Sequence, residues 1–268
     1  MRIAQHGLKI ILTILCLLSV GFGLNKTLHA HNSPILVCYS TDHFPPFIVG
    51  QGEKIPKNPG IQIELLQKVI EAEKTKFTLI RRPWKRCLKM LETGEVDMIP
   101  GASFLESRSK YAKYPRDKTG ALDNERKFIK SEYLIFYNIR NNSDLRWDGE
   151  SLSGVERHIG AELGFSVVTH LMEDGFNILE LENTAKGLEL LERGRIDAFV
   201  SFLNLVNPIL EKKDHTIKHF SKPYLSKNYY LIMSNSFYSA HPALSERIWD
   251  RIPAVKREMA DYLNKKYF

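Results

Sequence analysis

The stretch RPWKRCLKMLETGEVDMIPGASFLESR, residues 82–108, decides the fold of this chain. Four of its apolar residues lie three or four positions apart and so share one face of a helix: Trp84, Cys87, Leu88 and Leu91. Gly94 follows this helix at the position where a residue with a left-handed backbone conformation, usually glycine, commonly ends a helix. Residues 96–99 predict a short buried strand, 101–103 a loop beyond it, and Arg108 follows. In open α/β sheets, ligands bind at this end of the strands.

Strand-like and helix-like segments alternate along the rest of the chain. The other predicted strands are 35–39, 77–80, 133–139, 158–161 and 229–233, and the other predicted helices are 61–72 (behind Gly60), 183–193 and 242–268. Pro253 is expected to kink or divide the last helix. This alternation predicts an α/β protein with largely parallel sheets.

A ten-residue pattern occurs twice in the chain. Leu-x-x-Leu-Glu-x-Gly-x-Val/Ile-Asp ends at Asp97 and again, one hundred positions later, at Asp197. The repeat predicts two lobes of similar construction, and we interpret both aspartates as structural residues that fix a turn. Lobe 1 is expected to comprise 31–137 and 225–268, and lobe 2 to comprise 138–224. Two crossings between lobes form a hinge, which suits closure on a ligand.

The first 30 residues have the features of a secretory signal peptide. Arg2 and Lys9 are basic, residues 10–20 are mostly apolar, and the stretch ending at Ala30 resembles a cleavage site. The apolar run is shorter than the roughly 20 residues that a membrane-spanning helix needs. An uncleaved anchor is the alternative. Cleavage after Ala30 leaves a mature chain that begins at His31.

Charge and motifs exclude several classes of function. The net charge is +7, and the leader contributes three bases (Arg2, Lys9 and Lys26) and no acid, so the mature chain carries 7 − 3 = +4. Acids and bases are interleaved, without a basic block rich in aromatic residues, so nucleic-acid binding is not expected. No nucleophile elbow, zinc-ligand spacing or phosphate-binding glycine loop is present. We therefore expect no catalytic residues, metal or cofactor.

Two cysteines remain after the leader. Cys38 lies near the end of the first predicted strand and Cys87 in the first turn of the helix that follows Arg82. An exported protein can form a disulfide, and both positions are expected near the same edge of a sheet. A bridge and a pair of buried thiols are the two alternatives, because sequence does not reveal the geometry that a bridge requires.

In this order and spacing, the segments resemble the bacterial extracellular solute-binding proteins of family 3, the periplasmic amino-acid-binding type. The resemblance covers nearly the whole mature chain and rests on the leader, 44–47 (Phe-Pro-Pro-Phe), Gly60, 84–97, 101–108, Tyr114-Pro115, Gly164-Phe165-Ser166 and 194–197. It implies a type II periplasmic-binding-protein fold with two lobes, each a mainly parallel sheet flanked by helices, joined by a two-strand hinge. It also implies a monomeric, non-enzymatic periplasmic receptor that delivers a small, carboxylate-bearing solute to an ABC importer's permease.

The resemblance assigns ligand-binding roles in the first half of the chain. Phe44 corresponds to an aromatic residue that stacks over the ligand, Gly101 and Ser103 to a loop that bonds its carboxylate, and Arg108 to an arginine that binds it. A guanidinium fits a carboxylate bidentately, which agrees with this role. Alternatively, Arg108 pairs with Glu106 on the surface, and Phe44 packs beneath the prolines.

The resemblance also implies ligand-binding roles for Trp84 and for residues in the second half of the chain. Phe165 and Ser166 correspond to a helix N-terminus whose amides face the cleft and favour an anion; the alternative for Ser166 is an ordinary helix cap. Trp84 either lines the cleft or anchors its helix. Relatives that bind α-amino acids usually place an aspartate where this chain has Ser201, and a hydroxyl does not offset a buried cation. Either another acid supplies the charge or the ligand is not a standard amino acid.

Two other functions remain as alternatives. The same domain could report its ligand to a membrane signalling partner. It could also be a cyclohexadienyl-dehydratase-like enzyme, which needs a positioned acid in the cleft. Glu106, Asp42 and His43 are the nearest candidates, but they form no recognisable catalytic arrangement.

Overall fold

The structure is a computed structural model that describes residues 33–141, 144–211 and 216–268. The predicted signal peptide lies outside these residues, so its assignment stays a prediction. All described helices and strands belong to one unit, Pro34–Phe268. Within the described ranges, no helix combines the length and the apolar character needed to cross a membrane.

Strands and helices alternate in the first half of this unit, as the sequence predicts. Its elements are β1 (Ile35–Ser40), α2 (Ile61–Ala72), β2 (Phe77–Arg82), α3 (Trp84–Glu92), β3 (Met98–Ser103), α4 (Glu106–Ser109), β4 (Ala112–Lys113) and the 3-10 turn η1 (Asn124–Arg126). The bounds predicted for α2 are confirmed. Gly60 enters the helix with a φ of 108°, and an added Cβ would lie 2.4 Å from the Phe47 carbonyl oxygen. Glycine alone meets both conditions comfortably.

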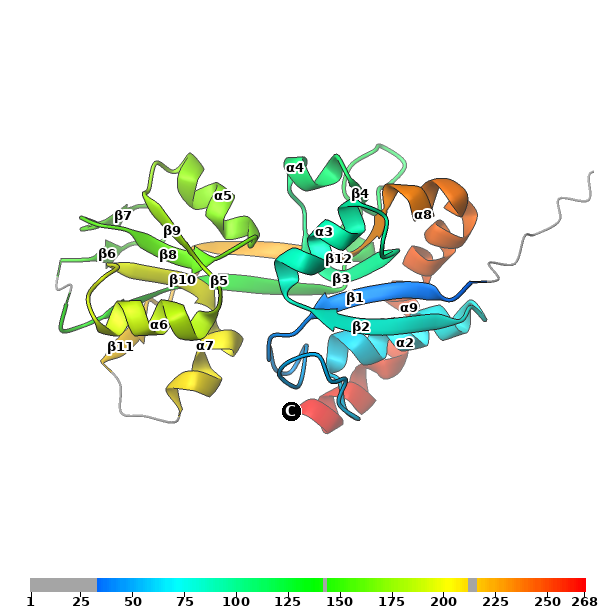
Figure 1. Ribbon diagram of the computed structural model, residues 1–268, viewed down its shortest axis with the longest axis horizontal. Helices are drawn as coiled ribbons and strands as arrows, with labels where there is room; N and C mark the ends of the chain where they lie inside the picture. Colours follow the sequence, from blue (N-terminus) through cyan, green and yellow to red (C-terminus); the bar gives the residue numbers. More distant parts are fainter. Residues whose placement is uncertain (1–32, 142–143, 212–215) are drawn as a thin grey trace, which may run out of the picture. The chain divides into compact units, whose positions relative to one another are not determined.

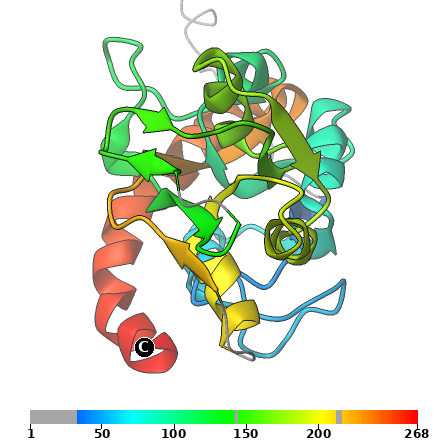
Figure 2. The same cartoon turned by 90° about the vertical axis from the view of Figure 1, so that its left-hand side faces the viewer.

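The second half has a similar order of elements between two long strands. The long strands are β5 (Ile129–Asn138) and β12 (Leu225–Ser234). Between them lie β6 (Arg146–Trp147), β7 (Leu152–Ser153), β8 (Ile159–Glu162), α5 (Ser166–Glu173), β9 (Ile178–Leu181), α6 (Thr184–Glu192), β10 (Ala198–Phe202), α7 (Leu203–Leu210) and β11 (Ile217–His219). The chain ends in α8 (Asn235–Ala240) and α9 (Pro242–Tyr267). The short hairpin of β6 and β7, in green, faces the viewer in Figure 2.

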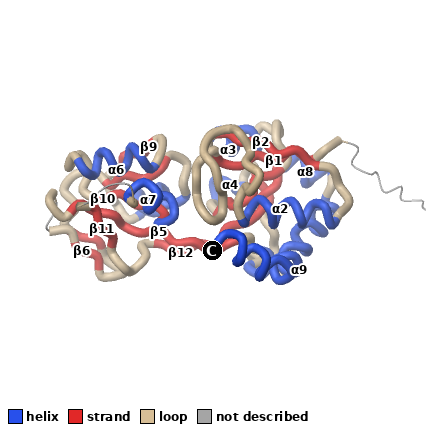
Figure 3. Tube along the Cα trace, turned by 90° about the horizontal axis from the view of Figure 1, so that it is seen from below, coloured by secondary structure: helices blue, strands red, loops and turns tan. Residues whose placement is uncertain are grey.

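One sheet runs through both halves, in the order β2-β1-β3-β12-β5-β10-β8-β9. In the first half β2, β1 and β3 are parallel, and in the second half β9, β8 and β10 are parallel. The strands β12 and β5 are antiparallel to these sets and to each other. Figures 1 and 3 show β5 and β12 side by side between the halves. This is a two-lobed α/β fold with mainly parallel sheets joined by two strands.

The repeated sequence pattern has a repeated structure. Gly94 and Gly194 follow α3 and α6 with φ values of 75° and 64°. Asp97 then accepts a hydrogen bond from the Leu36 amide at 2.8 Å. In the second half Asp197 accepts from two amides, those of Glu156 at 2.8 Å and Arg157 at 2.6 Å. Asp97 therefore ties the start of β3 to β1, and Asp197 ties the start of β10 to the loop before β8, which confirms their structural role.

Two predictions about local structure are wrong. Residues 101–103 were expected to form a loop, but they lie in β3, because Ala102 and Ser103 pair with Tyr230 and Tyr229 of β12. Tertiary pairing thus extends the strand past its glycine. Pro253 was expected to kink or divide the last helix, but α9 continues through it. Buried Ile252 and Val255 hold this part of α9 against the core.

The two cysteines of the mature chain form a disulfide. Cys38 in β1 and Cys87 in the first turn of α3 are bonded, with their Cα atoms 5.5 Å apart. Both side chains are fully buried. The bridge fastens α3 to the strand that leads to residues 40–44, and the alternative of two free thiols is thereby excluded.

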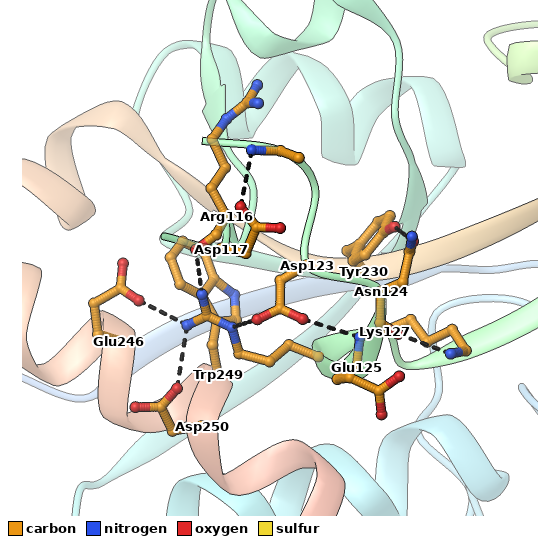
Figure 4. Close-up of polar contacts among 12 residues, drawn as sticks. Arg116, Asp117, Asp123, Asn124, Glu125, Lys127, Tyr230, Glu246, Trp249 and Asp250 are labelled. Atoms are coloured by element: carbon orange, nitrogen blue, oxygen red, sulfur yellow. Dashed lines mark hydrogen bonds and ion pairs between the residues drawn. The ribbon is translucent and has the colours of Figure 1, made fainter. Parts of the chain in front are cut away.

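A buried arginine secures the irregular segment between β4 and β5. Arg126 donates hydrogen bonds to Asp123 at 2.8 Å, and to Glu246 at 2.7 Å and Asp250 at 3.2 Å on α9. Its guanidinium carbon lies 5.9 Å from the ring centre of Trp249. Figure 4 labels the three acids: Glu246 and Asp250 lie on α9, and Asp123 precedes η1. The buried guanidinium is therefore paired with acids, as expected for a structural contact.

Candidate ligand-binding site

Seven of the eight predicted site residues line one pocket at the carboxyl ends of β1 and β3 and the start of α5. They are Phe44, Trp84, Gly101, Ser103, Arg108, Phe165 and Ser166. The eighth, Ser201, does not line it. The cavity volume is about 70 Å³, and because one water occupies roughly 10–15 Å³ on this scale, it holds only a few small-molecule atoms. The ligand roles of these residues stay predictions.

A pair of serines connects the two halves at this pocket. Ser103, the last residue of β3, donates a hydrogen bond from its hydroxyl to that of Ser166, at 2.8 Å. Ser166 is the first residue of α5, whose N-cap is Phe165 and whose first turn has no side-chain cap. The alternative of an ordinary cap by Ser166 is therefore wrong. The first amides of a helix favour an anion when no side chain satisfies them.

Arg108 is a buried cation in this pocket, only 3% exposed. Its guanidinium donates to the carbonyl oxygens of Ser103 at 2.5 Å and Gly164 at 3.3 Å, and Nε has no hydrogen-bond partner among the residues described. No acid in the described part of the chain forms an ion pair with it. The alternative of a surface pair with Glu106 is thus wrong. A buried charge without a counter-ion is costly unless a ligand supplies one.

Trp84 contacts both Arg108 and the second half of the chain. Its indole Nε1 donates to the Gly164 carbonyl oxygen at 3.2 Å. The Arg108 guanidinium carbon lies 5.9 Å from its ring centre, within reach of a cation–π contact. Gly164 has a φ of 78°, and an added Cβ would lie 3.6 Å from the indole. Trp84 therefore lines the pocket and also joins the two halves.

An aromatic cluster forms the apolar wall of the pocket, with Phe202 at its centre. The ring centre of Phe202 lies 5.0 Å from Phe44, 4.1 Å from Tyr133 and 5.7 Å from Phe165. Tyr229 of β12 lies 5.9 Å away. Phe44 therefore packs against the second half of the chain and not only beneath its neighbouring prolines. Sequence reasoning missed Phe202, although its place at the end of a strand was a usable signal.

Gln62 was also missed, and it explains the need for Gly101. The φ of Gly101 is 79°, and an added Cβ would lie 1.9 Å from Gln62 Nε2. The Gln62 side chain is buried against the pocket, and its amide nitrogen has no hydrogen-bond partner among the described residues. The pocket thus presents a second unused N–H donor besides Arg108.

The loop that carries Phe44 is held by a second buried arginine. Arg81 of β2 donates to the carbonyl oxygens of Ser40 at 3.1 Å, Gly50 at 2.7 Å and Lys54 at 3.2 Å. These bonds join both ends of the loop to the sheet. Arg81 therefore positions the loop and with it the aromatic ring over the pocket.

Ser201 is buried behind the pocket wall, where it contacts an acid that sequence reasoning did not single out. Its hydroxyl donates to Oε1 of Glu162 at 2.7 Å, and the Thr184 hydroxyl donates to the same atom at 2.8 Å. Burial raises the pKa of Glu162 to about 7, and nearby Asp42, which lines the pocket, raises it as well. Glu162 ends β8, so its place at a strand tip was the signal for it.

Comparisons with known proteins bear on the fold. No family model and no curated protein sequence matches the chain. Among solved structures, a histidine kinase sensor domain with similarity to periplasmic binding proteins is 19% identical, over 88% of this chain and 96% of its own, with a TM-score of 0.65. The arginine-, lysine-, histidine-binding protein ArtJ from Geobacillus stearothermophilus is 17% identical, over 88% and 95%, with a TM-score of 0.65.

The substrate binding protein of an amino acid ABC transporter is 17% identical, over 88% of this chain and 99% of its own, with a TM-score of 0.61. At these identities the likeness concerns the fold alone. It agrees with the strand order, in which two sets of parallel strands are joined by β5 and β12. The chain therefore has the two-lobed α/β fold of the type II periplasmic binding proteins.

Proposed function

We propose that this protein is a periplasmic solute-binding protein that captures a small, carboxylate-bearing solute between its two lobes. The observation that carries the proposal is Arg108, a buried guanidinium that faces the pocket without an acidic partner in the described residues. A ligand carboxylate would supply the missing charge. The unused amide of Gln62 and the uncapped first turn of α5 offer further donors to the same anion.

A titration with matched ligands and variants tests this role. Amino acids, organic acids, polyamines and small peptides are first screened by thermal shift, because a ligand that binds the folded state raises its melting temperature. Each hit is then titrated by calorimetry against Arg108→Gln, and against Arg86→Gln, an exposed arginine of α3, as the control. Loss of a charged hydrogen-bond partner should weaken the affinity by roughly 100-fold in Arg108→Gln only. A carboxylate ligand that binds both variants equally would refute the assignment.

For the partner of this domain, we propose the permease of an ABC importer. The support is the solved structure of a substrate binding protein of an amino acid ABC transporter with the same fold. The histidine kinase sensor domain of the same fold supports the second candidate, a ligand-sensing role. Ligand-dependent stimulation of a co-reconstituted permease ATPase would favour import. We further propose a monomer exported to the periplasm, which predicts a mature N-terminus at His31 by mass spectrometry.

One observation favours an enzyme as a further candidate. Glu162 is the positioned acid that a dehydratase-like reaction would need, since it is buried near the pocket and its pKa is raised to about 7. Incubation of the purified protein with prephenate or arogenate distinguishes the two functions. Consumption that depends on Glu162 would support the enzyme, and saturable binding without consumption would support the receptor. We favour the receptor, because the similar solved structures are described as binding proteins and a sensor domain.

A further inference from the structure

A groove lies beside the hinge strand β12, apart from the candidate pocket. Its volume is about 680 Å³, and its walls are the segment around α4, helix α5 and β12. In the described part of the chain it shares no lining residue with the pocket. A hollow of this size holds many waters, since one water needs only roughly 10–15 Å³. Titratable side chains in its walls therefore exchange protons with the solvent.

Lys227 of β12 joins the two walls of this groove. On one side its Nζ donates a hydrogen bond to the Phe104 carbonyl oxygen at 3.1 Å, and on the other it lies 2.9 Å from Nε2 of His170 in α5. An ammonium has donors only, so Nε2 accepts this bond and the imidazole is neutral, with its proton on Nδ1. Nδ1 lies 3.5 Å from Oε2 of Glu173. We call the Phe104 carbonyl, Lys227 and His170 the hinge clasp.

Both ends of the hinge clasp continue into the candidate pocket. Phe104 directly follows Ser103, and His170 lies about one helical turn after Ser166 in α5. Ser103 and Ser166 are the two serines whose hydroxyls bond across the pocket. The hinge clasp and the serine pair thus hold the same two segments together, one in the groove and the other in the pocket. Loss of the clasp would therefore loosen the two halves beside the pocket.

Burial and nearby charges set the protonation of the hinge clasp. Charged groups approach it from three elements: Glu173 and Asp174 from α5, Lys227 from β12, and Glu106, Arg108 and Lys110 from the segment around α4. Burial lowers the pKa of His170 below its usual 6.5, and the Lys227 ammonium lowers it further against the opposing effect of the two α5 acids. Burial and Arg108 lower the pKa of Lys227 to about 8. At neutral pH the clasp therefore consists of a charged lysine and a neutral histidine.

Protonation of His170 would remove the acceptor of the clasp. Nε2 would then carry a proton, and two cations would lie 2.9 Å apart, which repel each other. The clasped form binds this proton less tightly than the open form, because its pKa is the lower of the two. The clasp is therefore favoured above the ordinary pKa of histidine and is lost as the pH falls.

We propose that the hinge clasp is a pH-sensitive device: protonation of His170 opens it and loosens the closure of the two lobes around the pocket. The consequence for affinity rests on the proposed function, because it requires a ligand in that pocket. The protein then holds its ligand more weakly in acid than at neutral pH. The opening of the clasp itself needs no ligand, so it is measured separately.

Distances between the lobes of the ligand-free protein test the opening. Spin labels are attached through Lys68→Cys in α2 and Lys186→Cys in α6, both exposed positions, and are measured by pulsed electron paramagnetic resonance at about pH 7.5 and about pH 5. The distance distribution should lengthen or broaden at the lower pH. His170→Gln keeps a neutral acceptor at every pH and should abolish the change. His158→Gln, an exposed histidine of the same lobe, is the control and should behave as the wild type.

Calorimetric titrations with propionate, glutarate and L-glutamate at the same two pH values test the effect on affinity. For any of these that binds, the loss of affinity in acid should be roughly tenfold larger in the wild type and His158→Gln than in His170→Gln. This comparison also cancels the titration of Glu162, which is common to all three proteins.

The outcomes separate this inference from the proposed function. Wild-type distances that do not respond to pH, or that respond equally in His170→Gln, would overturn the clasp and leave the carboxylate site standing. If no carboxylate binds while other solutes do, the proposed function is overturned, and the distances still decide the clasp. Should His170→Gln fail to fold, Lys227→Met replaces it: without the donor, the longer distances should appear at both pH values, and a normal response to pH would refute the device.

Discussion

Replacing Glu162 with glutamine should change how the stability of the ligand-free protein depends on pH. Burial raises the pKa of this carboxyl from 4.5 to about 7. The unfolded chain therefore ionises Glu162 near pH 4.5, whereas the folded chain keeps it protonated until about pH 7. Between these values unfolding releases a proton, so the free energy of unfolding falls as the pH rises. Glutamine is neutral throughout and shows no such loss.

The size of the effect follows from the two pKa values. Their difference, 7 − 4.5 = 2.5, corresponds to about 3 kcal/mol at 1.36 kcal/mol for each pKa unit. The contribution is fully present below pH 4.5 and is lost as the pH rises through about 7. Relative to the wild type, Glu162→Gln should therefore gain about 3 kcal/mol of unfolding free energy over this range.

Urea unfolding at a series of pH values from below 4.5 to above 7 measures this difference. Comparison of the variant with the wild type cancels every other group that titrates. Glu180→Gln, the same substitution at an exposed site on β9, should differ from the wild type by a constant amount. A constant difference for Glu162→Gln as well would show that the folded protein already stabilises the ionised carboxylate. It would refute both the raised pKa and the unpaired state of Oε2.

Three further substitutions test the frame of the pocket. Replacing both Cys38 and Cys87 with alanine opens a bridge that spans 49 residues, and urea unfolding should show a loss of about 4 kcal/mol that reductant reproduces in the wild type. Gly101→Ala should lower the free energy of unfolding by more than 1 kcal/mol and weaken ligand affinity, because the new methyl group collides with Gln62. Gly120→Ala is the control: Gly120 has a similar positive φ but open space around it, so this variant reports backbone strain alone. Phe202→Ala should cost about 3 kcal/mol and shift calorimetric preference toward larger carboxylates; unchanged preference would argue against its place in the wall.

Much of the scaffold could be predicted from local sequence. Helix α2 occupies its predicted bounds because both its apolar spacing and its start at Gly60 are encoded within the segment. The two copies of the helix, glycine and strand pattern were recognisable for the same reason. The lobe boundaries stay predictions, because β5 and β12 run continuously between the halves and offer no break in structure. The bounds of β3 needed knowledge of its pairing with β12, which sequence spacing does not contain.

The candidate site was only partly predictable. Residues in recognisable segments, such as Arg108 and Ser166, were found and lie together at one pocket. Gln62, Glu162 and Phe202 were missed, because each enters the site through neighbours that are distant in sequence. Glu162 reaches Ser201 across 39 residues and Gln62 reaches Gly101 from another element. Only a position at a strand tip could have marked Glu162 and Phe202, since ligands gather there.

Two equally buried acids of the second lobe differ in how far the fold satisfies them. Asp197 and Glu162 are each 4% exposed. One oxygen of Asp197 accepts two backbone amides, and its other oxygen faces the guanidinium of Arg157 at 3.5 Å. Glu162 ends a strand in the same lobe, yet one of its oxygens has no donor among the described residues. Most buried polar atoms in folded proteins have a hydrogen-bond partner, so a buried oxygen without one is unusual. A carboxylate bound at Arg108, as the proposed function expects, would offset the cost of burying that cation and so stabilise the ligand-bound state of the protein.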